Sequence, residues 1–470
     1  MPAEAMDRVR RHTTAIDIVL IALVAIAAAL PFLRGHAEAI SPDSRSYIVP
    51  AENLLAGRGL RGKGAAATFT ESIPGYPRTP GPETLRPPVY PALIAFFLAA
   101  GSGLRGVIVF QELLNLAVAI ALYLLLLHAT RSRGIALVAA LLCAWFPHAA
   151  QVAGEILSET LFTALLLAAI IATDLAIHEE SVPLMTTAGL LVGLATMTRP
   201  IAIYFAVPVA VVVFLCVKRR AALLTALLIA SLILPLAWTY RNLRAAGVAT
   251  FSTSAAENLL LQWAAGVHVT RNSSDLYRLT ASQQQFGYRA PLHRARLPLF
   301  YQAMALARAD GLDPRQLNTA QKSVYERRLA IHLLRQHPVA LAEIVFSGVV
   351  ELLLFEPATV ALDYSWIPRQ AYAAFVWLMF LTLVIAVAGV GAIRRRDRPL
   401  ALLIVATIGY FTLTASIPET SLRYALAYLP MYFAAVAAGM VELIPRVAGH
   451  LRRVDVVSSR ASRATASGPS

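Results

Sequence analysis

Long apolar runs recur along the chain, and they constrain its fold more than any other feature. Each is close to the roughly 20 residues that a helix needs to cross the apolar core of a bilayer. Runs of this kind cover residues 14–33 and 371–393. The chain of 470 residues is 58% hydrophobic and 14% charged, more apolar and less charged than a typical soluble domain. We therefore expect an all-α, polytopic membrane protein.

Basic residues predict the orientation of this protein. Short clusters at 8–11, 218–220, 394–396 and 446–453 lie at the ends of apolar runs, where the positive-inside rule places them in the cytoplasm. The net charge of +14 therefore needs no nucleic acid as a partner, because the basic residues do not gather on one soluble face. One threading agrees with all four clusters and has about ten spans, with both termini inside. Its spans are 14–33, 107–128, 134–150, 157–177, 183–198, 200–217, 221–240, 371–393, 399–416 and 425–443.

Two further apolar segments do not fit this threading if each crosses once. Residues 89–100 are short, and residues 339–355 carry two acids. We expect interfacial or half-inserted helices here. If the two segments instead cross as a pair, the protein has about twelve spans.

The threading divides the chain into four parts. Residues 1–240 form an N-terminal membrane module with a first extracytoplasmic loop at about 34–86, and residues 241–338 form a second such loop. Residues 339–445 return to the membrane, and 446–470 are expected to be a disordered cytoplasmic tail. Scarce lysine and abundant alanine are typical of a GC-rich bacterial genome. We therefore expect a multi-pass protein of the bacterial inner membrane.

Acidic residues near the expected outer surface are candidates for catalysis. Asp43 follows the first span by a few residues, where a carboxylate can act as general base toward an acceptor hydroxyl. Asp43 can equally cap the helix that follows, and spacing alone favours the cap. Glu155 and Glu159 lie four apart and are expected on one face of a helix start. Acids at a helix N-terminus can simply be stabilised by the helix dipole. Two such acids beside Asp43, however, repel each other and Asp43 unless a cation, a proton or a substrate hydroxyl lies between them.

Four arginines fall on the same outer side, against the positive-inside tendency. They are Arg86, Arg199, Arg241 and Arg423. Guanidinium groups match the oxygens of a phosphate, so a phosphate-bearing lipid substrate explains them. For any single arginine, snorkelling to the lipid headgroups is the simpler explanation.

Other chemistry is not expected. The histidines, among them His128, His148, His268 and His293, show no metal-ligand spacing, and the Gly-rich stretch 57–64 lacks a phosphate-loop pattern. We therefore expect neither a metal site nor a cofactor. Asp17 and Asp174 lie near the cytoplasmic ends of spans, where we expect them to be solvated.

In their order, these motifs resemble the GT-C glycosyltransferases, and most of all bacterial relatives of protein O-mannosyltransferases and aminoarabinose transferases. The resemblance spans nearly the whole chain, but each motif is short. It rests on Asp43, Arg-Pro-Pro-Val-Tyr at 86–90, Ser-Glu-Thr-Leu-Phe at 158–162, Thr-Arg-Pro at 198–200, Tyr-Arg-Asn at 240–242 and Leu-Arg-Tyr at 422–424.

The resemblance implies roles for several residues. A first-loop acid that acts as base or binds the acceptor falls on Asp43, and the acid at a helix start falls on Glu159, with Glu155 one turn earlier. The basic residue that holds the donor phosphate falls on Arg86. The family's Arg-Tyr pair near the last span falls on Arg423 and Tyr424. The chain lacks the family's second acid after Asp43, so a metal-dependent mechanism does not follow.

The implied reaction is an inverting transfer of a sugar from a polyprenyl-phosphate to an extracytoplasmic protein, lipid or cell-envelope glycan. A transporter or lipid flippase is the main alternative, and a polysaccharide ligase without a GT-C fold is another. A transporter places ionisable groups at mid-span, on broken helices. Here charge gathers at one face of largely clean spans, which favours an interfacial enzyme.

Overall fold

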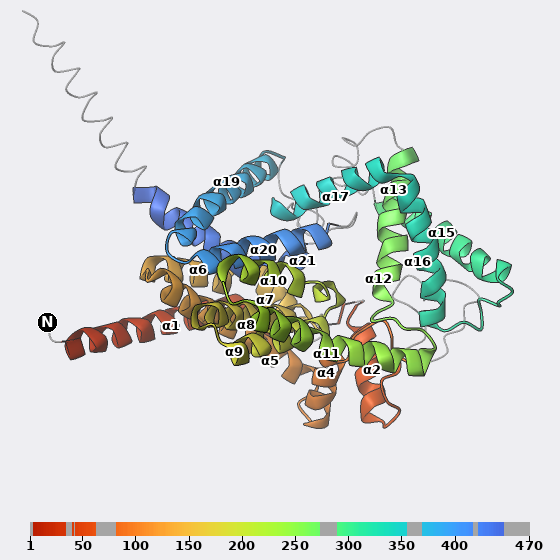
Figure 1. Cartoon of the computed structure of the whole chain (residues 1–470), viewed down its shortest axis with the longest axis horizontal. Helices are drawn as coiled ribbons and strands as arrows, with labels where there is room; N and C mark the ends of the chain where they lie inside the picture. The colour runs from red at the N-terminus through yellow and green to blue at the C-terminus, as the bar shows by residue number, and fades with distance from the viewer. Residues whose placement is uncertain are drawn as a thin grey trace, which may run out of the picture.

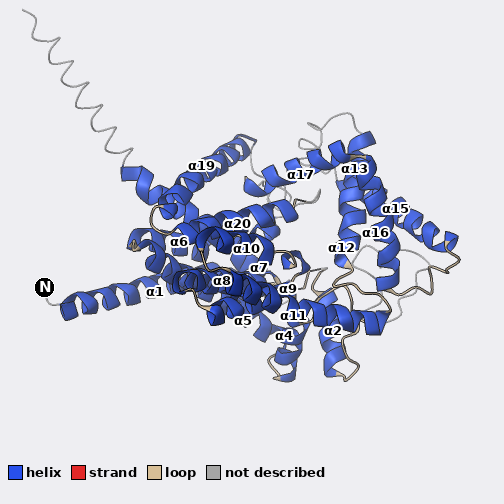
Figure 2. Ribbon diagram, viewed as in Figure 1, coloured by secondary structure: helices blue, strands red, loops and turns tan. Residues whose placement is uncertain are grey.

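The computed structural model describes residues 3–33, 40–41, 43–62, 81–272, 289–354, 369–416 and 422–445, and its regular elements there are helices joined by turns and loops (Figures 1 and 2). Within these ranges there is no strand, only an isolated bridge between Arg61 and Pro82. The predicted disordered tail, 446–470, lies outside them, and so do residues 63–80 of the first predicted outer loop.

Most helices form one bundle around a continuous apolar core, whose largest buried side chains include Tyr123, Phe162 and Phe411. The bundle joins the N-terminal helices to the last helices of the chain (Figure 1). Its helices are α1 (Ala3–Leu33), α5 (Gly103–Thr130), α6 (Arg133–Trp145), α7 (Pro147–Ala153), α8 (Glu159–Glu179), α9 (Val182–Thr196), the 3-10 turn η1 (Pro200–Ala202), α10 (Ala206–Cys216), α11 (Ala221–Ala246), α19 (Arg369–Arg394), α20 (Arg398–Thr414), α21 (Leu422–Ala425) and a last helix, Leu429–Pro445.

The predicted all-α, polytopic membrane architecture is confirmed. Among the described residues, five helices are long and apolar enough to cross a membrane, and two bent helix pairs raise this number to seven if each pair is one span. Five shorter apolar helices accompany them, one of which is α4 (Val89–Ala99). The predicted ten to twelve spans therefore require shorter helices to cross as well, and that count stays a prediction.

Several bundle helices present apolar side chains outward. Ile16, Val19 and Leu23 on α1 are exposed, and so are Ile233 and Leu236 on α11. In water such contiguous apolar surface is rare. In a bilayer these faces contact the lipid acyl chains, so the exposed apolar side chains hold the protein in the membrane.

Two glycines allow the C-terminal helices to cross closely. A Cβ on Gly389 of α19 would overlap the carbonyl oxygen of Ala435, and one on Gly439 would overlap the carbonyl oxygen of Ile385. Small residues at such crossings bring two backbones into direct van der Waals contact, which stabilises helix pairs in membranes. The last helix is thereby fixed against α19.

Most of the second predicted outer loop and the helix that follows it, Pro338–Leu353, form a small helical unit with a core of its own. Leu260, Phe300, Met304 and Ala330 are buried together in it, and Ile344 of α17 closes it. Figure 1 shows these helices grouped to one side of the bundle. They are α12 (Ser254–Asn258), the π-helical turn η2 (Leu259–Ala264), α13 (Ala265–Asn272), α15 (Arg289–Ala309), α16 (Thr319–Gln336) and α17 (Pro338–Leu353).

Three local predictions are wrong. Asp17 and Asp174 are buried rather than solvated; two nitrogens of Arg133 and the hydroxyl of Tyr123 donate to the Asp17 carboxylate. Glu155 and Glu159 do not share a helix face, because α8 begins only at Glu159 and Glu155 lies in the preceding turn.

Candidate functional site

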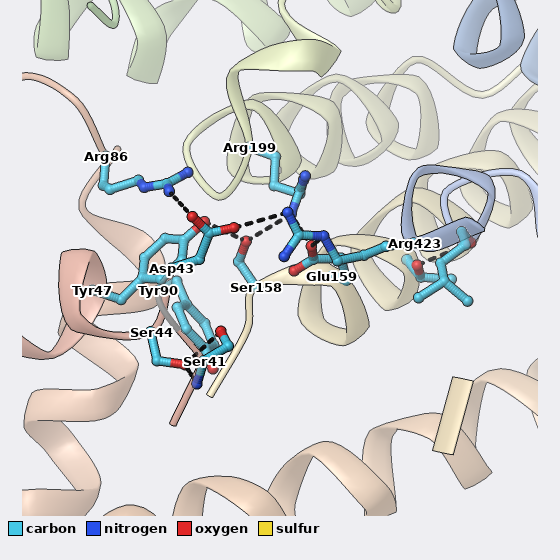
Figure 3. A network of polar contacts seen from close by, with 12 residues as sticks. Ser41, Asp43, Ser44, Tyr47, Arg86, Tyr90, Ser158, Glu159, Arg199 and Arg423 are labelled. Atoms are coloured by element: carbon cyan, nitrogen blue, oxygen red, sulfur yellow. Dashed lines mark hydrogen bonds and ion pairs between the residues drawn. The ribbon is translucent and has the colours of Figure 1, made fainter. Parts of the chain in front are cut away.

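Three arginines and two acids from distant parts of the chain meet in one network (Figure 3). The acids are Asp43, just before α2 (Arg45–Leu55), and Glu159, the first residue of α8. The cations come from three other segments: Arg86 before α4, Arg199 between α9 and η1, and Arg423 on α21. The sequence predicted all five as site residues, and the structure brings them together.

Asp43 is held by arginines and does not cap α2. The cap residue is Ser44, and its side chain makes no capping hydrogen bond. Instead, Nη2 of Arg423 donates to Asp43 Oδ2 at 2.8 Å, and Nη2 of Arg86 lies 3.4 Å from Oδ1. The capping interpretation, which spacing favoured, is therefore wrong. Asp43 keeps 31% of its side chain exposed, so a ligand can reach it.

Positive charge controls the protonation of Asp43. Burial alone raises the pKa of this carboxyl, but the charges of Arg86 and Arg423 outweigh it, and the pKa lies below its usual value. Asp43 is therefore ionised at neutral pH. As long as both arginines are paired with it, it is a weak base.

Glu159 is the buried acid of the network, with only 4% of its side chain exposed. Arg199 Nη1 lies 2.7 Å and Arg423 Nε lies 3.0 Å from the same oxygen, Oε1. Neither contact has the alignment of a good hydrogen bond, so both are ion pairs held by charge. The other oxygen, Oε2, is buried and accepts no hydrogen bond from the described residues.

Prolines explain why two of the arginines face the site. Arg199 precedes Pro200 and has an extended backbone, at φ −138° and ψ 125°. A proline disfavours helical geometry at the residue before it, so α9 ends and the Arg199 side chain leaves the helix at this point. Arg86 likewise precedes Pro87, and Glu83 holds its loop by accepting the backbone N–H groups of Leu85 and Arg86 at 2.7 and 2.9 Å.

A second layer of polar contacts, which the sequence did not indicate, orients the arginines. Ser46 Oγ accepts from Arg86 Nε at 2.9 Å, and Ser158 Oγ accepts from Arg199 Nη1 at 3.2 Å. The hydroxyl of Tyr47 lies 3.0 Å from Ser158 Oγ, and its ring lies under the guanidinium of Arg86. Tyrosine and serine are too common in helices for sequence alone to identify them as site residues.

The other predicted site residues lie elsewhere. Arg241 donates to the backbone carbonyls of Leu60 and Glu83, so it supports the Arg86 loop from behind. Tyr424 contributes its ring, 5.7 Å from the Arg423 guanidinium carbon. Glu155 contributes its backbone carbonyl, which accepts from Gln111.

One further acid, which was not predicted, lies within electrostatic range of Arg86 and Asp43. Glu257 is a buried residue of α12, in the small helical unit. Burial raises the pKa of Glu257 to about 7, Arg86 works against the rise, and Asp43 adds to it. The small helical unit therefore adds a titratable group to the surroundings of the network.

Comparison with known proteins identifies a similar family over part of the chain. Residues 85–242 match the family model described as dolichyl-phosphate-mannose-protein mannosyltransferase, and this range contains Arg86, Glu159 and Arg199. No curated protein shows significant sequence similarity to the chain.

Solved structures with the same fold include two from Archaeoglobus fulgidus. Its oligosaccharyltransferase AglB, in complex with an inhibitory peptide and a dolichol-phosphate, superposes with a TM-score of 0.53 at 14% identity, over 95% of this chain and 52% of that one. The apo form gives a TM-score of 0.52 at 14% identity, over 94% and 51%. The chain thus spans about half the length of these relatives. ArnT from Cupriavidus metallidurans, bound to undecaprenyl phosphate, gives a TM-score of 0.40 at 15% identity, over 90% and 77%.

The resemblance seen in the sequence motifs thus agrees with the family model and with the fold of the archaeal enzyme. Residues 85–242 thus match a mannosyltransferase family, and the chain has the fold of the archaeal oligosaccharyltransferase.

Proposed function

We propose that this protein transfers a sugar from a polyprenyl-phosphate donor to an acceptor on the extracytoplasmic face of the bacterial inner membrane. One observation carries the proposal: three arginines and two acids converge at the ends of helices, one of them at the first residue of α8. A transporter that moves its substrate through the bilayer needs such groups near mid-span. The matched family is named for a dolichyl-phosphate-linked donor, which supports a lipid-phosphate sugar.

The arginines suit the phosphate of the donor. Three guanidinium groups against two carboxylates leave the network with a net charge of +1. Guanidinium binds phosphate oxygens through paired, charge-assisted hydrogen bonds. Arg86 and Arg423 are the proposed phosphate ligands because both also contact Asp43, at the more accessible side of the network. Arg199 pairs with the buried Glu159 and adds its positive charge to the network.

Asp43 is the proposed general base. In the free protein its two arginine partners lower the pKa of Asp43 and weaken it as a base. A donor phosphate that attracts Arg86 and Arg423 relieves this effect, and the basicity of Asp43 rises. Asp43 therefore becomes an effective base only after the donor has bound.

The proposed reaction balances as a single displacement. The acceptor oxygen forms a bond to the anomeric carbon of the sugar while its proton passes to Asp43. The bond between that carbon and the phosphate oxygen breaks, and the polyprenyl phosphate leaves with the electron pair. Preorganised arginines stabilise the charge that develops on the leaving phosphate.

Glu159 is proposed to orient a hydroxyl group. Its Oε2 is buried and accepts no hydrogen bond from the described residues, whereas buried carboxylate oxygens are normally hydrogen-bonded. A hydroxyl of the donor sugar or of the acceptor would satisfy this oxygen. Glu159→Gln keeps the size of the side chain but weakens such a bond, so we expect slower transfer with little change in donor phosphate binding.

Purified protein in lipid nanodiscs, incubated with a panel of radiolabelled polyprenyl-phosphate sugars and a bacterial envelope extract as acceptor, tests the proposal. We expect one donor to lose its label to the acceptor fraction, with release of polyprenyl phosphate. Transport of intact donor across the bilayer without cleavage would instead identify a flippase.

A further inference from the structure

A second cluster of ionisable groups lies at the opposite end of α8 from the network. Asp174 and His178 lie four residues apart on α8, and Asp397 caps the start of α20 by accepting the backbone N–H of Leu400. At 1.5 Å per residue, Asp174 lies about 22 Å along the helix from Glu159. The cluster is therefore separate from the proposed transfer chemistry.

The geometry brings one ligand atom from each residue together. The three atoms, a histidine nitrogen and two carboxylate oxygens, all lie within 4.8 Å of one another. His178 Nε2 lies 3.4 Å from Asp397 Oδ2. Ligands of a tetrahedral zinc ion, each about 2.0–2.1 Å from the metal, are about 3.3–3.4 Å apart. The observed spacing of this pair fits such an ion.

The backbone fixes the tautomer of His178. Its Nδ1 lies 2.8 Å from the carbonyl oxygen of Asp174, and because a carbonyl only accepts, Nδ1 must carry the proton. In a neutral ring Nε2 then presents a lone pair to Asp397 Oδ2. Two acceptors that face each other repel unless a proton or a cation lies between them. Histidine ligands of metals are commonly held by this kind of hydrogen bond from the other nitrogen.

Asp174 supplies an independent observation. Its side chain is 0% exposed, and neither carboxylate oxygen accepts a hydrogen bond from the described residues. A buried carboxylate is normally paired, hydrogen-bonded or bound to a metal. His178 Nδ1 lies 3.8 Å from Oδ1, but it already donates to the carbonyl oxygen of Asp174.

We propose that Asp174, His178 and Asp397 bind a divalent transition-metal ion of the zinc class. Two carboxylates and one imidazole are ligands that Zn²⁺ accepts, with water in the fourth position. Water can reach the site because 44% of the His178 side chain is exposed. The neighbouring Arg395 and Arg396 pair with Glu442, which offsets their charge. The ion would join the end of α8 to the start of α20.

Direct metal binding tests the site without reference to activity. We expect the full-length protein, purified in detergent and treated with chelator, to bind one Zn²⁺ per chain in equilibrium dialysis. Asp174→Asn, His178→Ala and Asp397→Asn should each weaken Zn²⁺ binding by at least about tenfold. Asp397→Asn is the most informative, because asparagine still caps α20 while one charge is lost.

His128→Ala is the matched control, since His128 is also an exposed histidine in the last turn of a helix, α5. It should leave Zn²⁺ binding unchanged. If Asp174→Asn does not fold, the other two variants still decide the question. A wild-type protein that binds no Zn²⁺, or one whose binding survives both His178→Ala and Asp397→Asn, overturns the proposal and leaves a proton-sharing ion pair.

Discussion

Arg423 is the residue whose loss should affect the network most, because it alone contacts both acids. Arg423→Ala removes an ion pair of 2.8 Å to Asp43 and one of 3.0 Å to Glu159. Removing one partner of a buried ion pair lowers the folding stability by about 3–5 kcal/mol. Removing one partner of an exposed ion pair lowers it by less than about 1 kcal/mol. Arg423 is 24% exposed, and both acids keep another arginine, Arg199 at 2.7 Å and Arg86 at 3.4 Å. We therefore expect a loss of about 2 kcal/mol in stability.

The same substitution should weaken binding of the donor phosphate. Truncating one partner of a buried charged contact costs about 2–5 kcal/mol, and two remaining arginines favour the lower end. A loss of about 2 kcal/mol is about thirtyfold in Kd. Arg423→Lys keeps the charge but loses the planar fork, so it should recover only part of this affinity. Arg86→Ala should weaken binding in the same direction.

Calorimetric titration of the purified variants with a short-chain polyprenyl phosphate measures this affinity. Arg395→Ala is the control, because Arg395 is a largely exposed arginine paired with Glu442 instead of the network. Glu159→Gln distinguishes a loss of positive charge from a general disruption of the network. It removes a negative group, so phosphate binding should stay the same or tighten. Unchanged Kd in both folded Arg423→Ala and folded Arg86→Ala would refute the assignment of these arginines to the phosphate.

Three further predictions concern titration, packing and topology. The folded-state pKa of Glu257, about 7, exceeds its ordinary value of 4.5, so the folded protein holds this proton more tightly and stability falls as pH rises through that window. Thermal unfolding of the wild type relative to Glu257→Gln should show this fall, of at most about 3 kcal/mol, and a difference that does not change with pH contradicts it. Gly389→Ala should lower the melting temperature, because the added Cβ would overlap a backbone carbonyl oxygen. Gly391→Ala on the same helix is the control, because its Cβ meets nothing within 4 Å and the melting temperature should not change. Equal melting temperatures of the two variants would exclude the close crossing. Alkaline phosphatase fused near Asn272 should be active and fused near Arg396 inactive, and the reverse pattern overturns the orientation.

The helices could be predicted well because each span carries its own apolar run. The predicted segments 221–240 and 371–393 correspond to Ala221–Ala246 and Arg369–Arg394. The predicted span 134–150 is instead two helices bent by 52° at Phe146, before Pro147. The proline was visible in the sequence, but the direction of the bend depends on packing against α1 and α5, which no local pattern encodes.

The site could be predicted only in part. Charge against the positive-inside tendency identified the arginines, and three of the four converge. Arg241 could not be separated from them, because its partners are backbone carbonyls far along the chain. The spacing of Asp174 and His178 was visible as i, i+4, but Asp397 joins them only through the packing of α20 against α8.

The reaction of Asp43→Asn with a lipid-linked sugar tests the central claim most directly. Asparagine keeps the size of the side chain and cannot take the acceptor proton. In single-turnover transfer from the donor that the wild type uses, we expect the rate to fall by about a hundredfold or more. Donor affinity should be unchanged or tighter, since Arg86 and Arg423 lose a competing carboxylate. A folded Asp43→Asn protein that transfers sugar at the wild-type rate would contradict the assignment of Asp43 as the general base.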